Sequence, residues 1–184
     1  MTAMQPNLPV LVAAPGMTMA EAHAASSAAF RVPGDAEWPC LAQPHGPHRV
    51  ALKDVQRGFV LPAGRFTVLE GCRGVVFRLR VTPQLGYLGL DDVTRLADEM
   101  VETIEKASWL PRLRAPRSQL MKNLREAGGD RAGSWLADEW LAELWVRRPV
   151  EKDSGVARLL RLNEDSYLAT CIVWDIRLAA AIGG

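Results

Sequence analysis

One segment governs the fold that we predict for this chain: residues 91–109, which read DDVTRLADEMVETIEKASW. Its apolar residues recur at i, i+3, i+4, i+7, i+8 and i+11, which is the spacing of one continuous stripe on a helix. They are Val93, Leu96, Ala97, Met100, Val101 and Ile104. The opposite face is acidic, and Asp91 and Asp92 stand where free backbone N–H groups favour carboxylates. The sequence therefore predicts an amphipathic helix that packs on a flat apolar surface.

Strand patterns flank this helix on both sides. Residues 65–82 alternate apolar and polar side chains around a glycine-containing turn, which predicts a β-hairpin. In its second strand, one face is expected to carry Val75, Phe77, Leu79 and Val81, and the other Val76, Arg78, Arg80 and Thr82. Further candidate strands are residues 50–55, 59–61, 156–162 and 167–176.

Residues 134–148 fit either a helix or a strand. They are rich in Ala, Leu and Glu, but Trp140, Ala142, Leu144 and Val146 would also share one face of a strand. We favour a strand for the second half, because the segments that follow have strand patterns. A single strand here would place Trp135 and Trp145 on the face opposite Trp140.

The order of these elements is strands, two helices, then strands, without alternating βα units. We therefore expect an α+β fold in which an antiparallel sheet consists of an N-terminal hairpin and a C-terminal meander. One face of the sheet packs against the helix at 91–109 and a shorter helix at 116–127. The other face is left to solvent or to a partner.

The N-terminal part of the chain differs in character. Prolines and glycines arrive every few residues between 31 and 49, and the apolar run at 8–14 is short and follows no Lys or Arg, unlike a signal peptide. Thr18 and Glu21 have the spacing of a helix capping box. We expect residues 1–48 to be a flexible or weakly structured segment with a Pro-rich loop, followed by one α+β domain at 49–184.

Composition limits the possible functions. The net charge of +1 over 184 residues gives no global argument for nucleic-acid or membrane binding, and the chain has no apolar run of transmembrane length. Three widely spaced cysteines do not form a disulfide framework. We expect a soluble protein and favour the cytoplasm over the periplasm or secretion.

Common catalytic motifs are absent, and all three histidines precede residue 49. Cys72 is predicted at the hairpin tip, where neighbouring Arg73 would favour its thiolate. Cys40, His45 and His48 are zinc or copper ligands by type, but their spacing matches no standard zinc module. We predict no catalytic residue, metal or cofactor, and the alternative is a thiol- or metal-dependent enzyme that uses Cys72 or the loop of Cys40, His45 and His48.

Basic and aromatic residues favour a protein partner instead. No acid interrupts residues 106–125, and tryptophans next to arginines near residue 145 are typical of interaction hot spots. We predict a non-enzymatic interaction module, such as an adaptor, a chaperone or an inhibitor or immunity protein. Its partner would be a protein, with an acidic surface as one option, bound through an exposed sheet face and a Trp/Arg segment. The predicted partner-binding residues are Trp135, Trp145, Arg147, Arg148, Arg112, Arg114 and Arg117.

Overall fold

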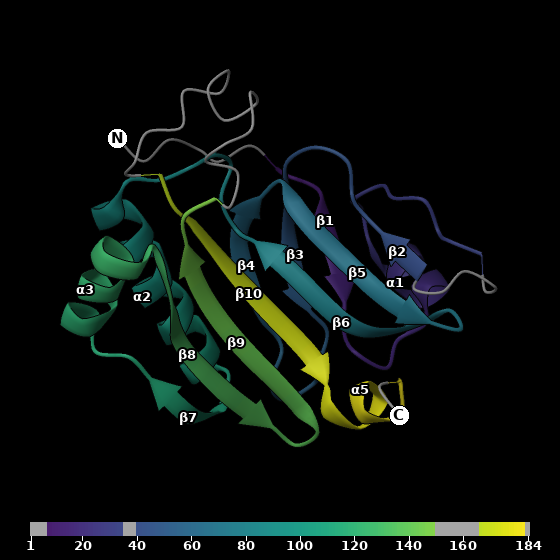
Figure 1. Ribbon diagram of the computed structural model, residues 1–184. Coiled ribbons are helices and arrows are strands. Elements are labelled where there is room, and N and C mark those ends of the chain that lie inside the picture. Colours follow the sequence, from purple (N-terminus) through teal and green to yellow (C-terminus); the bar gives the residue numbers. More distant parts are fainter. Residues whose placement is uncertain (1–6, 35–39, 150–165, 183–184) are drawn as a thin grey trace.

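The computed structural model describes residues 7–34, 40–149 and 166–182 (Figure 1). In chain order, the elements are β1 (Val10–Ala13), α1 (Met19–Ala25), β2 (Cys40–Ala42), β3 (His48–Leu52), β4 (Phe59–Gly64), β5 (Phe66–Cys72), β6 (Val75–Thr82), α2 (Leu90–Lys106), β7 (Leu110–Arg114), α3 (Arg117–Ala127), β8 (Gly129–Ala137), β9 (Trp140–Arg147), β10 (Leu168–Asp175) and α5 (Ile176–Ile182). Helices pack against a largely antiparallel sheet, so the predicted α+β class is confirmed.

The strands form two sheets. Seven antiparallel strands have the order β2-β5-β6-β10-β9-β8-β7, and three strands have the order β1-β3-β4. The chain passes from the small sheet to the large one between β4 and β5, at Gly64 and Arg65. A Cβ on Gly64 would lie 2.3 Å from the carbonyl oxygen of Thr82, so this close crossing requires glycine.

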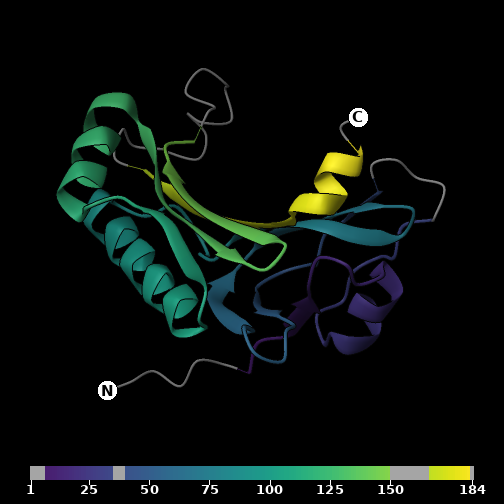
Figure 2. The same cartoon turned by 90° about the horizontal axis from the view of Figure 1, so that it is seen from below.

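Helix α2 carries the apolar stripe that the sequence predicted. Val93, Ala97, Met100, Val101 and Ile104 are buried. The helix contacts β4 of the small sheet and β8, β9 and β10 of the large one. It ends at Lys106, three residues earlier than predicted. Figure 2 shows α2, the three-stranded sheet and α1 on one side of the seven-stranded sheet and α5 on the other.

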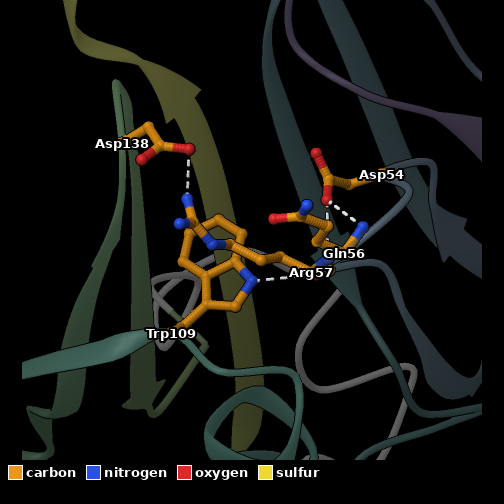
Figure 3. A network of polar contacts seen from close by, with 5 residues as sticks. All are labelled: Asp54, Gln56, Arg57, Trp109 and Asp138. Carbon is orange, nitrogen blue, oxygen red and sulfur yellow. Dashed lines mark hydrogen bonds and ion pairs between the residues drawn. The ribbon is translucent and has the colours of Figure 1, made fainter.

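Trp109 follows α2 and lies between the two sheets. Its ring contacts Phe59 of β4 at 5.8 Å and Trp140 of β9 at 6.3 Å between centroids. Its indole N–H donates to the backbone carbonyl of Arg57 at 2.9 Å. The Arg57 side chain pairs with Asp138 in the β8–β9 turn (Figure 3). The β3–β4 turn, the end of α2 and the β8–β9 turn are thereby joined.

The predicted hairpin at 65–82 is confirmed as β5 and β6, with Arg73 and Gly74 at its tip. The predicted inner face is only partly correct. Leu79 and Val81 are buried, but Val76 is buried in place of Val75, because the pairing shifts register between Glu70 and Gly71. Such a bulge reverses the faces on one side of it.

The ambiguous segment at 134–148 is a second hairpin. Residues 129–137 form β8 and Trp140–Arg147 forms β9, which confirms a strand for the second half. Ala142, Leu144 and Val146 are buried as predicted. Strands β8, β9 and β10 are consecutive antiparallel neighbours and form a meander. The predicted meander had other members: it placed a strand at 156–162 between the second half of 134–148 and 167–176, whereas β9 pairs directly with β10. The candidate strand at 156–162 lies outside the described residues.

The prediction that residues 1–48 are weakly structured is wrong for their described part. Strand β1 pairs in parallel with β3, and β2 pairs with β5. Leu11 of β1 and Met19 of α1 are fully buried members of the main core. The partners of these short strands lie far away in the sequence, so a local pattern does not reveal the pairing.

The predicted capping box at the start of α1 is confirmed. The Thr18 hydroxyl accepts the Glu21 N–H at 3.1 Å, and the Thr18 N–H donates to the Glu21 carboxylate at 2.8 Å. The backbone and hydroxyl hydrogen bonds from Thr18 lower the pKa of Glu21 below its ordinary value of 4.5. Their contribution to helix stability is therefore present at neutral pH and is lost as the pH falls through that lowered pKa.

The N-terminal strand should be essential for stability. Leu11→Ala empties a buried position of β1 and should lower the free energy of unfolding by about 2–5 kcal/mol, because it combines lost apolar burial with a cavity. Val12→Ala is the matched control, since Val12 is half-buried on the other side of the strand and should have a smaller effect. Urea denaturation measures both. Equal effects of the two substitutions would contradict the packing of β1.

The buried stripe of α2 should not tolerate charge. Met100→Asp places a carboxylate at a fully buried position and should destabilise the protein by several kcal/mol. Glu102→Asp, on the exposed face of the same helix, should change stability by no more than about 0.5 kcal/mol. A melting temperature of the Met100 variant equal to that of wild type would show that α2 does not dock as described.

Candidate functional site

The outward side of the seven-stranded sheet carries the candidate site. We call it the open face: the side chains of this sheet that point away from α2. Helix α5 lies on the same side and contacts β10 (Figure 2). Strand register assigns its members, because directly paired residues lie on the same face. Three rows cross the sheet. They are Phe66, Thr82, Thr170, Trp145 and Arg131; then Val68, Arg80, Ile172, Glu143 and Ser134; then Glu70, Arg78, Trp174, Leu141 and Leu136. Arg147 of β9 lies beside the first row.

Glu70 and two arginines form one cluster on this face. Glu70 is buried, pairs with Arg78, and accepts a hydrogen bond from Nη2 of Arg80 at 3.0 Å. All three residues come from the β5–β6 hairpin. The shared carboxylate fixes both guanidinium groups, so their remaining N–H donors are held in place.

Glu143 forms a second cluster, on β8 and β9. It is buried and accepts a hydrogen bond from Nη1 of Arg131 at 2.6 Å. The indole N–H of Trp145 lies 3.4 Å from its other carboxylate oxygen. The Arg131 guanidinium carbon lies 5.6 Å from the centroid of the Trp145 ring, which is within range of a cation–π contact.

The open face combines apolar surface with positive charge. This face carries four arginines and two glutamates. The arginines are Arg78, Arg80, Arg131 and Arg147, and both glutamates are buried and bonded to arginines. Trp145 is 36% exposed and Phe66 is 58% exposed. Exposed aromatic and arginine side chains are enriched in protein interfaces, whereas Lys and Glu are depleted there.

Trp145 and Arg147 lie on the open face, as predicted, but the predicted exposure of Trp135 is wrong. Trp135 is fully buried, and its indole N–H points toward Glu105 of α2 at 3.4 Å. The turn at residues 138–139 makes Trp135 the partner of Ala142, so it shares the inner face. Its ring lies so close to Gly133 that a Cβ there would approach within 2.3 Å.

Arg148 also belongs to the inner side. Its Nε and Nη2 atoms lie 3.3 and 3.2 Å from the hydroxyl of buried Tyr167, and its guanidinium carbon lies 5.5 Å from the ring centroid. The hydroxyl in turn donates to the Leu124 carbonyl of α3. Arg148 therefore fixes the end of α3 and is not free to contact a partner as Trp145 is.

Two of the three arginines of the predicted basic patch form ion pairs with helix α2 at the surface. Arg114 pairs with Glu105 at 3.3 Å, and Arg117 pairs with Asp98 at 3.1 Å. Both acids come from the outer side of α2, so the basic segment and the acidic helix face compensate each other. Arg112 is exposed on edge strand β7 and has no ion pair within the described part of the chain.

The candidate metal ligands do not converge. Cys40 is buried, and His48 is buried with its ring nitrogens 2.8 Å from the Gly46 carbonyl and 2.8 Å from the Thr67 hydroxyl. Its Nδ1 donates, because the Gly46 carbonyl can only accept. His45 is exposed in the loop between β2 and β3. Within residues 7–34, 40–149 and 166–182, three or more His, Cys, Asp or Glu side chains nowhere form a group that could hold a metal ion.

Cys72 should be the first thiol to react in the folded protein. It is half-buried near the hairpin tip, whereas Cys40 and Cys171 are buried, and burial raises the pKa of Cys171 to about 12. Iodoacetamide requires the thiolate, so mass spectrometry should find Cys72 labelled and the other two protected until denaturant is added. Cys72→Ser should leave the native protein unlabelled. A Cys72 rate roughly 100-fold above that of glutathione would instead support a thiol enzyme.

We compared the chain with protein-family models, curated proteins and solved structures, and none of them matches it. Of the helices in the described ranges, none is long and apolar enough to cross a membrane.

Sequence reasoning missed most of the open face. Arg78 and Arg80 did appear opposite the apolar residues of their strand, which was the available signal. The strand pattern also placed Glu143 on the same face as Trp145, but without a role. Glu70 and Arg131 were not identified, because their role depends on which strands become neighbours.

Proposed function

We propose that this protein is a non-enzymatic interaction module that binds a protein partner through the open face, with Trp145 and Arg147 as contact residues. Adaptors, chaperones and inhibitor or immunity proteins belong to this class. The observation that carries the proposal is that an arginine-rich face of the main sheet exposes Trp145 and Phe66. Antiparallel sheets with one solvated face usually place polar residues there, so exposed aromatic area calls for a partner.

The charge distribution supports a protein partner over nucleic acid or a membrane. The net charge is only +1, and part of the basic surface is paired with α2. Apolar side chains lie between the arginines of the open face, in contrast to the continuous cationic track that a phosphate backbone requires. The alternative thiol- or metal-dependent enzyme has no specific observation in its favour within the described residues.

The experiment first identifies a partner and then tests the contact. A photo-crosslinking amino acid at Leu141, on the open face, captures partners in the native host, and the same amino acid at Val60, exposed on the small sheet, is the control. The partner that crosslinks only from Leu141 is purified. Its affinity is then measured by calorimetry.

Trp145→Ala combined with Arg147→Ala should weaken this association by about 2 kcal/mol or more, which is roughly thirtyfold, as hot-spot truncations do. Both side chains point away from the core, so the variant should remain folded. The matched control is Tyr87→Ala with Arg95→Ala, which removes an exposed aromatic residue and an exposed arginine outside the open face. An affinity unchanged by the first pair, or lowered equally by both pairs, would refute the proposed contact.

A further inference from the structure

The two glutamate-centred clusters lie on opposite sides of the open face. Arg78 and Arg80 belong to β6, and Arg131 belongs to β8. Strands β10 and β9 separate them, so β6 and β8 are three strand spacings apart. At about 4.8 Å per spacing, this amounts to about 14 Å between the two sources of positive charge.

The strip between the clusters is mainly apolar. On β10, the open face carries Leu168, Thr170, Ile172 and Trp174, with no charged side chain among them. Leu141 of β9 pairs with Trp174 and extends the strip. Across the strands, the face therefore presents three parts in order. The first is the Glu70 cluster, in which two arginines share one carboxylate and leave one positive charge in excess. The second is the apolar strip, and the third is the Arg131–Glu143 pair, beside which Arg147 of β9 supplies the positive charge.

The arginines of both groups are ordered before any ligand binds. Each is attached to a buried glutamate, which restricts the side chains before any partner arrives. The side chains of Arg80 and Arg131 are 42% and 37% exposed. Because Nε of each is buried, a partner can reach only the N–H groups of the terminal nitrogens. Binding to groups that are already ordered loses less conformational freedom than binding to mobile side chains.

The charge disfavours a second copy of this chain as the occupant. Two open faces placed together would bring arginines against arginines, while Glu70 and Glu143 are buried and already bonded. A partner with carboxylates complements the same groups, and guanidinium–carboxylate pairs have favourable geometry.

We infer that the open face binds a polypeptide segment that carries carboxylates on both sides of an apolar centre and crosses the strands between the two arginine groups. This inference rests on the proposed function and specifies its partner. In an extended segment, acids about four residues apart span the required distance, at about 3.4 Å per residue. The apolar centre distinguishes this ligand from a nucleic acid, whose backbone is charged throughout.

A designed peptide tests the charge pattern directly. The probe is a fluorescein-labelled heptapeptide with a glutamate and an aspartate at each end and Leu-Trp-Leu in the middle, and fluorescence anisotropy measures its affinity. A peptide with Gln and Asn in place of the acids should bind at least tenfold more weakly. A peptide with Ser-Ser-Ser in the middle should also lose at least tenfold. Equal binding of the amide peptide, or tighter binding of a single-stranded oligonucleotide, would overturn the inference.

Variants of the protein locate the binding. Arg80→Glu and Arg131→Glu should each lower the affinity of the acidic heptapeptide at least tenfold, whereas Arg95→Glu on α2 should leave it unchanged. Since a glutamate beside Glu70 or Glu143 can disturb the fold, Arg80→Gln and Arg131→Gln are measured as well and should lower the affinity in the same direction. An equal loss with Arg95→Glu would place the binding elsewhere and overturn the inference.

The crosslinked partner separates this inference from the proposed function. If its binding depends on Trp145 and Arg147 but not on Arg80 and Arg131, the open face binds proteins and the acidic pattern is wrong. If its binding depends on none of these four residues, both the proposed function and the inferred acidic segment are wrong.

Discussion

The burial of Trp109 between the two sheets is the interaction on which the architecture depends. Its ring contacts Phe59 of the small sheet and Trp140 of the large one, and its N–H satisfies the Arg57 carbonyl. A buried indole that satisfies its only donor combines a large apolar area with a fixed orientation. Because Trp109 lies in the short link between α2 and edge strand β7, it also fixes where the helix ends and the strand begins. At the molecular surface, the ion pair between Arg57 and Asp138 joins the β3–β4 turn of the small sheet to the β8–β9 turn of the large one.

This arrangement places α2, the small sheet and α1 on one side of the large sheet (Figure 2). The open face is a consequence, because a sheet needs only one covered face to form a stable core. What distinguishes this open face is its composition. Glu70 and Glu143 are buried there, although α2 lies on the other side, and the arginine and aromatic side chains above them provide the cover. The face is therefore ordered by its own polar contacts.

The elements that the sequence predicted are those whose pattern is local. Helix α2 and the β5–β6 hairpin repeat apolar residues with the period of their own structure, and α3 ends at Gly128 with a positive φ of 74°. Pairing between distant segments leaves no such pattern, so β1 on β3 and β2 on β5 were missed. The two-residue turn after β8 was missed because Asp138 adopts a positive φ of 51° without glycine. That omission alone reversed the predicted face of Trp135.

The candidate site shows why overall charge was a poor guide. A net charge of +1 gave no global electrostatic argument, so the prediction relied on the local basic segment at 106–125. Asp98 and Glu105 on α2 pair with Arg117 and Arg114, so two of the three arginines that the sequence emphasised in this segment already have acidic partners. The arginines of the open face are scattered along β6, β8 and β9, and strand pairing alone gathers them. Counting charged residues along the sequence does not reveal a positive surface that distant segments form. The register of the sheet decides which charges are neighbours, not their proximity in the sequence.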